Sequence, residues 1–291
     1  MSGLVVVDKP PGWTSHDVVG RMRRLAGTRK VGHAGTLDPM ATGVLVLGVG
    51  RATRLLGHLQ LADKEYLATI RLGVRTVTDD AEGDVVETVD ASRVDADAIA
   101  DGVAALTGEI DQVPSSVSAV KIDGKRSYAR VRAGEDVQIP SRRVTVSTFE
   151  VQDLRRDGGV VDVDVRVACS SGTYVRALAR DLGAALGVGG HLTMLRRTRV
   201  GGFGLDVAGT LEQHAEELRV TSLDDAARAC FPSVDLDPDA ARAVGFGRRL
   251  PDTDLGAPGP VALFAGETFL ALYENDGADA RPVAVFVSGP A

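Results

Sequence analysis

Short apolar runs in the first third of the chain predict strands, separated by polar turns and one helix. Leu4–Val7 predicts a buried strand, and Asp8–Gly12 predicts a turn because its two prolines cannot donate to a β-ladder. Thr14 or Ser15 is placed to cap a helix whose apolar residues recur at helical spacing. Those residues are Val18, Val19, Met22 and Leu25. Beyond the polar stretch Arg29–Gly43, we expect the strands Val44–Leu47 and Tyr66–Leu72 and the helix Ala96–Leu106, which ends at Gly108.

The second half contains an alternating strand, a helix and a set of short apolar runs. Four valines between Val161 and Val167 alternate with two aspartates and an arginine, which predicts a strand with one wet face. Thr173–Leu186 predicts a helix that ends at Gly187. We interpret Asp235–Asp239 as a linker, and the apolar runs beyond it predict a compact β module: Val261–Phe264, Phe269–Tyr273 and Val283–Val287.

Together these elements predict the α+β class. A strand-rich core with helices packed on it is expected over residues 1–234, and a small β-rich module over residues 235–291. The stretch Val113–Arg143 is basic and rich in serine and glycine. This composition favours an excursion from the core over an element within it.

The composition argues against several classes of protein. No apolar run approaches the roughly 18–20 residues that span a membrane. The N-terminus has no basic segment before an apolar core, so no secretory signal is expected. Cys169 and Cys230 are far apart, which predicts a reducing compartment and no disulfide framework. We therefore expect a cytoplasmic protein.

The net charge of −7 is unevenly distributed along the chain. Residues 1–60 carry eight basic and three acidic side chains, and residues 114–143 carry seven and three. Residues 202–291 carry six basic and fifteen acidic side chains. A fold that gathers the basic segments on one face could still bind nucleic acid, so charge neither establishes nor excludes an RNA partner.

Motifs for metals and nucleotide cofactors are absent from the sequence. There is no Walker-type phosphate loop, no zinc-like spacing of Cys or His, and no HxxxH pair. Gly48–Thr53 follows a predicted strand but lacks the third glycine of a dinucleotide loop, and we interpret it as a strand-to-helix turn. No metal and no cofactor are expected.

Two polar positions are candidates for chemistry. Asp38 precedes a proline in the glycine-rich loop Gly32–Gly43, where an ionised carboxylate could act as nucleophile or general base. The competing interpretation of Asp38 is a helix cap or turn residue, and His33 in the same loop is equally ambiguous. Arg176 lies in the first turn of a predicted helix, where it opposes the helix dipole. It therefore requires an acidic partner or an anionic ligand, unless it is an ordinary surface arginine.

Seven sequence blocks, read together and in order, resemble the bacterial TruB-type tRNA pseudouridine synthases, which modify uridine-55 of tRNA. Any one block alone would be weak evidence. The blocks are Leu4–Ser15 (LVVVDKPPGWTS), His33–Gly43 (HAGTLDPMATG), Lys64–Tyr66 (KEY), Thr76–Gly83 (TVTDDAEG), Ser118–Tyr128 (SAVKIDGKRSY), Ser171–Arg176 (SGTYVR) and His191–Thr198 (HLTMLRRT).

The resemblance implies a pseudouridine synthase fold and roles for the catalytic residues. Asp38 matches the catalytic aspartate of a reaction that breaks the N-glycosidic bond, rotates the uracil and rejoins it through carbon 5 without a cofactor. Tyr66 would stack on the flipped base and assist the last proton removal. Arg176 would pair with Asp38 and contact the target phosphate, and Asp80 would hold Arg176. His33 would enter the base stack that the flipped nucleotide leaves.

The same resemblance implies how the RNA is held. Lys9 and Lys64 would shape the pocket or contact phosphates, and Leu195 would line the uracil pocket. Val113–Arg143 corresponds to the RNA-gripping insertion of the family, although Val117 stands where the family commonly has an aromatic residue. The basic residues expected to contact phosphates there are Lys121, Lys125, Arg126, Arg130 and Arg132. Residues 235–291 resemble a PUA-type RNA-binding module, although this segment is acidic.

The expected partner is the T-arm stem-loop of tRNA, bound by a monomer that needs no protein partner. A guide-RNA-dependent relative shares the catalytic core but would carry a larger C-terminal extension. A tRNA-folding chaperone, whose activity does not depend on catalysis, is the alternative from a different functional class.

Overall fold

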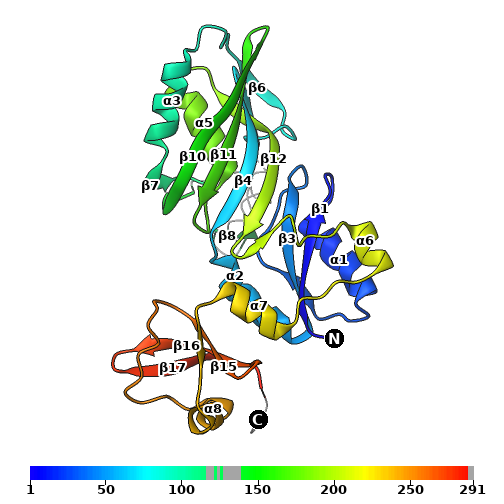
Figure 1. Cartoon of the computed structure of the whole chain (residues 1–291). Helices are drawn as coiled ribbons and strands as arrows, with labels where there is room; N and C mark the ends of the chain where they lie inside the picture. Colours follow the sequence, from blue (N-terminus) through cyan, green and yellow to red (C-terminus); the bar gives the residue numbers. More distant parts are fainter. Residues whose placement is uncertain (116–120, 123–124, 127–138, 288–291) are drawn as a thin grey trace.

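A large mixed sheet forms the body of the protein (Figure 1). The computed structural model describes residues 1–115, 121–122, 125–126 and 139–287. Within them, β12 and β3 run parallel, and the other pairings of the large sheet are antiparallel. Its strand order is β1 (Gly3–Lys9), β3 (Thr42–Val49), β12 (Gly190–Val200), β4 (Lys64–Leu72), β11 (Val160–Cys169), β10 (Arg142–Asp157) and β7 (Gly108–Gln112), with β2 (Val31–His33) on β3 and β13 (Phe203–Gly204) on β12.

The strands at the β1 end are buried on both faces. In β1, Val5 and Val7 contribute to the main core, whereas Leu4 and Val6 contribute to a second core on the other face. This explains why the sequence shows a continuous apolar run there. In β11 the valines are buried and the polar residues between them face outward, where Asp162 accepts two hydrogen bonds from Arg71 at 2.8 and 2.7 Å. The predicted wet face is thus confirmed.

Helices cover the sheet at both ends, as Figure 1 shows. α3 and α5 pack beside β10 and β12, and α1 with α6 lies beside β1 and β2. α1 begins after Thr14, which caps it as predicted by accepting a hydrogen bond from the Asp17 amide. The helices of the body are α1 (Ser15–Leu25), the 3-10 helix η1 (Gly50–Arg54), α2 (Leu56–Gln60), α3 (Ala96–Ala105), α5 (Val175–Ala185), α6 (Leu211–Glu216) and α7 (Leu223–Cys230).

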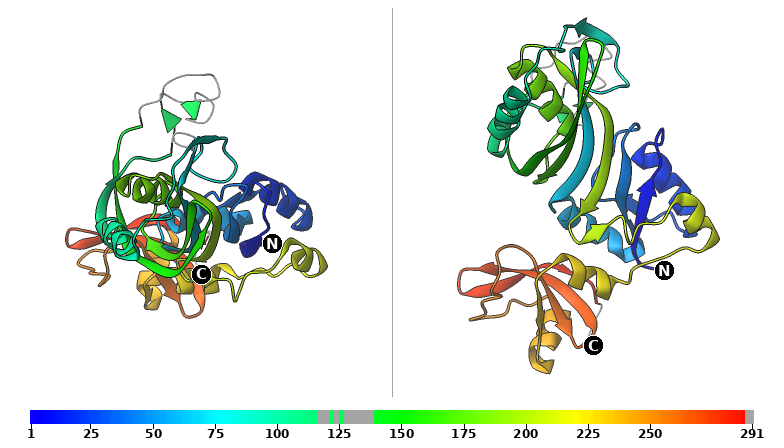
Figure 2. Two further views of the ribbon diagram at one scale, coloured as in Figure 1. Left: turned by 90° about the horizontal axis from the view of Figure 1, so that it is seen from above. Right: turned by 45° about the horizontal axis from the view of Figure 1, so that its top comes forward.

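The C-terminal segment forms a second, smaller sheet that packs against the body through α7, at the lower end of the molecule in the right view of Figure 2. Phe269 and Phe286 belong to the same apolar core as Leu4 and Val44 of the body. Arg54 of η1 donates to the Val285 carbonyl at 2.6 Å and lies over the Phe286 ring. The elements are β14 (Ser233–Asp235), α8 (Pro238–Gly245), β15 (Val261–Ala265), β16 (Thr268–Asp276) and β17 (Asp279–Val285).

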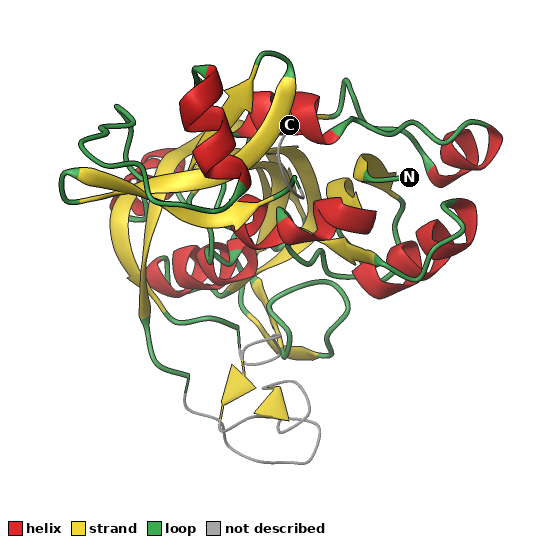
Figure 3. Ribbon diagram, turned by 90° about the horizontal axis from the view of Figure 1, so that it is seen from below, coloured by secondary structure: helices red, strands yellow, loops and turns green. Residues whose placement is uncertain are grey.

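Two small strand pairs complete the described chain. β5 (Val74–Thr76) pairs with β6 (Val85–Thr88), and β8 (Lys121–Ile122) pairs with β9 (Lys125–Arg126). Figure 3 shows β8 and β9 outside the large sheet, within the stretch predicted to leave the core.

The α+β prediction is confirmed, with local differences. Asp235–Asp239 is not a linker, because Asp235 pairs with Phe264 in the sheet and Asp237 caps α8. The last strand spans Asp279–Val285, whereas the apolar run predicted Val283–Val287. Two strands that polar residues obscure in the sequence, β10 and β12, were not predicted. The helix expected from Thr173 begins at Val175.

Gly183 lets α5 approach the start of β12 more closely than any side chain would allow. A Cβ atom at this position would lie 2.2 Å from the backbone of Gly189 and Gly190. Gly20 in α1 has no atom within 4 Å of the same point. We expect Gly183→Ala to lower the free energy of unfolding by about 1–3 kcal/mol through overpacking. Gly20→Ala should raise it by about 0.4–1 kcal/mol. Urea denaturation of both variants checks this, and equal effects would contradict it.

Candidate active site

A cavity of about 330 Å³ opens where the β2–β3 loop, β4, β12 and the start of α5 meet. Five of the residues singled out in the sequence line it, although they are spread along the chain from residue 38 to residue 195. The lining includes Asp38, Lys64, Tyr66, Arg176, Leu195 and Arg197. The volume is at the low end of the roughly 300–1,000 Å³ typical of small-molecule sites.

The loop that carries Asp38 is anchored through its backbone. Ser15 of α1 both accepts from the Leu37 amide at 2.9 Å and donates to the Leu37 carbonyl at 3.1 Å. Lys9 donates to the Pro39 carbonyl at 3.1 Å, and the Gly12 amide donates to the same oxygen at 2.9 Å. These contacts hold both neighbours of Asp38 and leave its carboxylate available to the cavity.

Arg176 joins two carboxylates from different loops. Its Nε lies 3.1 Å from Asp38 Oδ2, and its Nη1 lies 3.1 Å from Asp80 Oδ2. Nη1 also donates to the Thr78 carbonyl at 2.8 Å. The side chain of Arg176 is only 7% exposed and that of Asp80 only 3%. Arg176 therefore has the acidic partners that its position at a helix N-terminus requires, and it is not a surface arginine.

Asp38 is the carboxylate of this network that remains open to the cavity, with 35% of its side chain exposed. Burial raises the pKa of Asp38, while the Arg176 guanidinium opposes the rise by favouring the anion. Asp80 faces away from the cavity lining and accepts a hydrogen bond from the Glu82 amide at 3.1 Å. The two carboxylates thus have different surroundings around one guanidinium.

Tyr66 and Leu195 supply the apolar surface of the cavity, and both are buried. They lie on the neighbouring strands β4 and β12. The phenol of Tyr66 interacts with Arg197, and its pKa is raised, mainly by burial. Tyr66 is therefore a neutral hydroxyl at physiological pH.

Both predicted lysines are buried and bound to backbone carbonyls. Lys9 is 0% exposed and donates to the carbonyls of Pro10, Trp13 and Pro39, at 2.9, 2.7 and 3.1 Å. Lys64 donates to the Gln60 and Ala62 carbonyls at 2.8 and 2.6 Å. Burial lowers the pKa of each lysine to about 8. In this structure Lys9 shapes the loop and has no exposed surface with which to contact a phosphate.

His33 lies in β2 and does not line the cavity. Its ring contacts that of His16 edge-on, with 5.6 Å between centroids. Of the basic positions predicted in the insertion, Lys121, Lys125 and Arg126 lie in β8 and β9. Arg130 and Arg132, together with Val117, lie outside the described residues.

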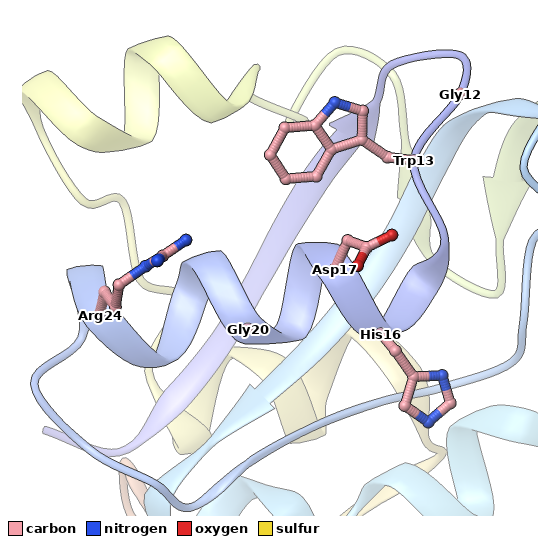
Figure 4. Close-up of a pocket in the computed structure, with 6 residues that line it drawn as sticks. All are labelled: Gly12, Trp13, His16, Asp17, Gly20 and Arg24. Carbon is pink, nitrogen blue, oxygen red and sulfur yellow. The ribbon is translucent and has the colours of Figure 1, made fainter.

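A second hollow follows the outer face of α1 (Figure 4). Trp13, which is 37% exposed, and Arg24 flank it, and His16 connects it to His33. Its one carboxylate, Asp17, accepts hydrogen bonds from the Thr14 amide and hydroxyl at 2.9 and 2.6 Å. Because this carboxylate is occupied by capping, the hollow lacks a carboxylate that is free to act as nucleophile or base, unlike the cavity beside Asp38.

Arg197 is a charged cavity residue that the sequence did not single out. It is almost fully buried and donates to the carbonyls of Val44, Gly35 and Thr36, at 2.7, 3.2 and 3.4 Å. It belongs to the block His191–Thr198. Arg196, Arg197 and Arg199 lie close together in the sequence, and the local pattern does not indicate which of them is buried.

Among the described residues, no group of three or more His, Cys, Asp or Glu side chains could hold a metal ion. None of the described helices is both long and apolar enough to cross a membrane.

Comparison with known families covers nearly the whole chain in three consecutive segments. Residues 23–175 match the TruB family pseudouridylate synthase N-terminal domain. Residues 176–233 match the tRNA pseudouridylate synthase B C-terminal domain. Residues 231–287 match the C-terminal domain of tRNA pseudouridine synthase II.

Two curated relatives are similar over their full length. The tRNA pseudouridine synthase B of Streptomyces griseus is 62% identical over 290 residues, covering 98% of this chain and 97% of the relative. The protein of the same name from Arthrobacter sp. is 61% identical over 296 residues, with the same coverage.

Solved structures show a similar fold. An H/ACA RNP bound to a substrate RNA containing 2′-deoxyuridine matches with a TM-score of 0.73 and 27% identity. A Cbf5-Nop10-Gar1 complex matches with a TM-score of 0.73 and 29% identity. Each match covers 98% of this chain and 85% of the matched chain.

The raised pKa of Asp38 predicts how it affects stability. A carboxyl whose pKa is higher in the folded than in the unfolded state costs stability once it ionises. The free energy of unfolding of the native protein, relative to Asp38→Asn, should therefore fall as pH rises from 3.8 through the folded pKa. Urea denaturation from below pH 3.8 up to pH 8 measures this difference.

Asp17 provides a control of opposite sign. Its pKa is lowered, mainly by the hydrogen bonds with Thr14. Relative to Asp17→Asn, the native protein should gain stability as pH rises through the folded pKa of Asp17 toward 3.8, and keep it above. The same direction of change for both variants would contradict the electrostatic description of the Asp38 site.

Proposed function

The chain belongs to the TruB family of pseudouridylate synthases, and we propose that it isomerises uridine-55 in the T-loop of tRNA to pseudouridine. The observation that carries this proposal is the Asp38 carboxylate, 3.1 Å from a buried guanidinium and open to a cavity sized for one nucleotide. The relatives of about 60% identity, named tRNA pseudouridine synthase B, support tRNA as the substrate.

The target uridine has to leave its base stack before it can enter the cavity. Flipping a base costs a few kcal/mol. Stacking on an aromatic ring contributes about 1–3 kcal/mol per base and can offset much of this cost. Tyr66 provides that ring, and Leu195 on the adjacent strand provides a second apolar surface. His33, outside the cavity, fills the gap that the flipped base leaves in the RNA.

Asp38 acts on the nucleotide as a carboxylate. Arg176 favours the ionised form of Asp38 and orients it, and Asp80 holds Arg176 on its other side. When the C1′–N1 bond breaks, its electron pair leaves with uracil. The ring then turns and C5 forms a bond to C1′. Loss of the proton from C5 and protonation of N1 complete the isomerisation, so no atom is gained or lost. Tyr66, neutral and hydrogen-bonded near Arg197, is placed to relay that proton.

The RNA is held mainly outside the cavity. Lys121, Lys125, Arg126 and Arg130 of the basic insertion contact phosphates, which position the tRNA without reading its sequence. The module formed by residues 235–291 is a PUA-type unit that adds a second contact with the T-arm. The enzyme works as a monomer in the cytoplasm, with no cofactor and no obligate protein partner.

Two alternatives differ from this proposal in testable ways. The matched Cbf5-Nop10-Gar1 complex contains partner proteins. This chain, in contrast, is similar over nearly its whole length to a relative named tRNA pseudouridine synthase B. A chaperone that helps tRNA fold would need the RNA-binding surface but not the Asp38 carboxylate, and the two activities can coexist in one protein.

Asp38→Asn separates catalysis from binding. The amide has nearly the same shape but lacks the charge, so pseudouridine formation should be lost while RNA binding persists. Purified protein is incubated with an unmodified T-arm stem-loop, and pseudouridine is then mapped by position. Full isomerisation by Asp38→Asn would exclude the assigned role, and product at another uridine would overturn the substrate assignment.

Lys125→Ala combined with Arg126→Ala tests the grip of the insertion. Each lost phosphate contact should reduce the slope of log binding constant against log salt concentration by about one. Filter binding of the stem-loop between low and high salt measures the slope. Arg219→Ala removes one exposed charge from the body and serves as the control. An unchanged slope in the double variant would place the grip elsewhere.

A further inference from the structure

The active-site cavity holds more positive charge than its carboxylates balance. Lys64, Arg176 and Arg197 line it, together with one carboxylate, Asp38. Arg176 is paired with Asp38 and Asp80. Among the described residues, no carboxylate oxygen forms an ion pair within 4 Å with either Lys64 or Arg197. Buried cations are normally paired with an anion. Lys64 and Arg197 therefore favour the binding of an anionic group in the cavity.

Lys64 and Arg197 flank one space above Gly35. A Cβ atom built on Gly35 would lie 3.7 Å from Lys64 Cε and 3.8 Å from Arg197 Nη1. Gly35 has a φ of +98°, a conformation that disfavours any other residue. The glycine therefore keeps the space between the two cations free of a side chain.

Among the described residues, Lys64 uses two of its three N–H donors. An ammonium has three N–H donors, and the Gln60 and Ala62 carbonyls use two of them. One donor remains on a side chain whose residue lines the cavity. Arg197 donates to the carbonyls of Val44, Gly35 and Thr36 and interacts with the phenol of Tyr66. These contacts fix the position of its positive charge.

The proposed reaction creates an anion in this cavity whichever way Asp38 acts. If Asp38 attacks C1′ or removes the C2′ proton, the C1′–N1 electron pair leaves on uracil, and its charge spreads over N1, O2 and O4. If Asp38 adds to C6, the negative charge appears on O4 before that bond breaks. In each case the uracil oxygens gain negative charge that they lack in the ground state.

We propose that Lys64, supported by the fixed charge of Arg197, stabilises the negative charge on the detached uracil by donating a hydrogen bond to one of its carbonyl oxygens. This inference rests on the proposed isomerisation. Donors aimed at charge that develops during a reaction stabilise the transition state more than the substrate. Lys64 is thereby a catalytic residue, and Arg197 is a positioning residue that also holds Tyr66 and the Asp38 loop.

Lys64→Gln tests the charge while keeping a donor for the neighbouring carbonyls. We expect the single-turnover rate constant on the T-arm stem-loop to fall by about 10²-fold, the typical loss of one such donor. The dissociation constant of the stem-loop should not change, because the charge develops only after binding. Arg219→Gln, which loses one positive charge outside the cavity, should retain the native rate constant. A Lys64→Gln rate constant equal to that of the native enzyme would overturn the proposal.

Stem-loops with 2-thiouridine or 4-thiouridine at the target test the same contact on the native enzyme. Sulfur is a weak acceptor, so one of the two substitutions should slow the native enzyme and have no further effect on Lys64→Gln. Native rates on both thio-substituted RNAs, or strictly additive losses with both, would overturn the proposal. Absence of pseudouridine with native enzyme and unmodified RNA would instead contradict the proposed function itself.

Discussion

The buried guanidinium of Arg176 is the constraint on which the site depends. It joins the loop of Asp38, the loop of Asp80 and the first turn of α5, three segments that are distant in sequence. Removing one partner of a buried ion pair typically costs about 3–5 kcal/mol, because the remaining charge loses its compensation. The chain therefore brings the three segments together in one arrangement, and the cavity forms where they meet.

Buried cations also support the loop around this ion pair, but they do so through backbone carbonyls. Lys9 holds Pro39, and Arg197 holds Gly35 and Thr36. Contacts of this kind fix the backbone without neutralising the Asp38 carboxylate. Asp38 thus keeps both a defined position and a side chain that is one-third exposed to the cavity. The loop is held through its backbone carbonyls, whereas the chemistry uses the Asp38 side chain. The support therefore does not occupy the carboxylate.

The rest of the fold separates chemistry from RNA contact. The cavity lies near the middle of the large sheet, on β4 and β12, where Tyr66 and Leu195 belong to the main apolar core. The basic insertion leaves the sheet between β7 and β10, and the C-terminal module is attached through a shared apolar core at the β1 end. Under the proposed function, these outer parts position the tRNA while the rigid centre handles one nucleotide.

The sequence by itself determined the elements whose patterns depend on local physics. The apolar runs of β1 and β3, the alternating valines of β11 and the cap of α1 at Thr14 all occur where they were predicted. The position of Arg176 at a helix N-terminus indicated acidic partners before their identity was known. The seven family blocks named most of the cavity residues, although the resemblance, not the local pattern, distinguished Asp38 from an ordinary turn residue.

Only the tertiary structure decided which side chains meet and which are buried. β10 and β12 were missed because β-bulges interrupt the alternation of apolar and polar residues in both strands. Asp235–Asp239 was wrongly interpreted as a linker because a short parallel strand and a helix cap use the same polar residues as a loop. Lys9 and Arg197 look like surface cations in the sequence, yet both are buried against carbonyls. Burial and hydrogen-bond partners depend on segments that are far away in the chain, so no local pattern can specify them.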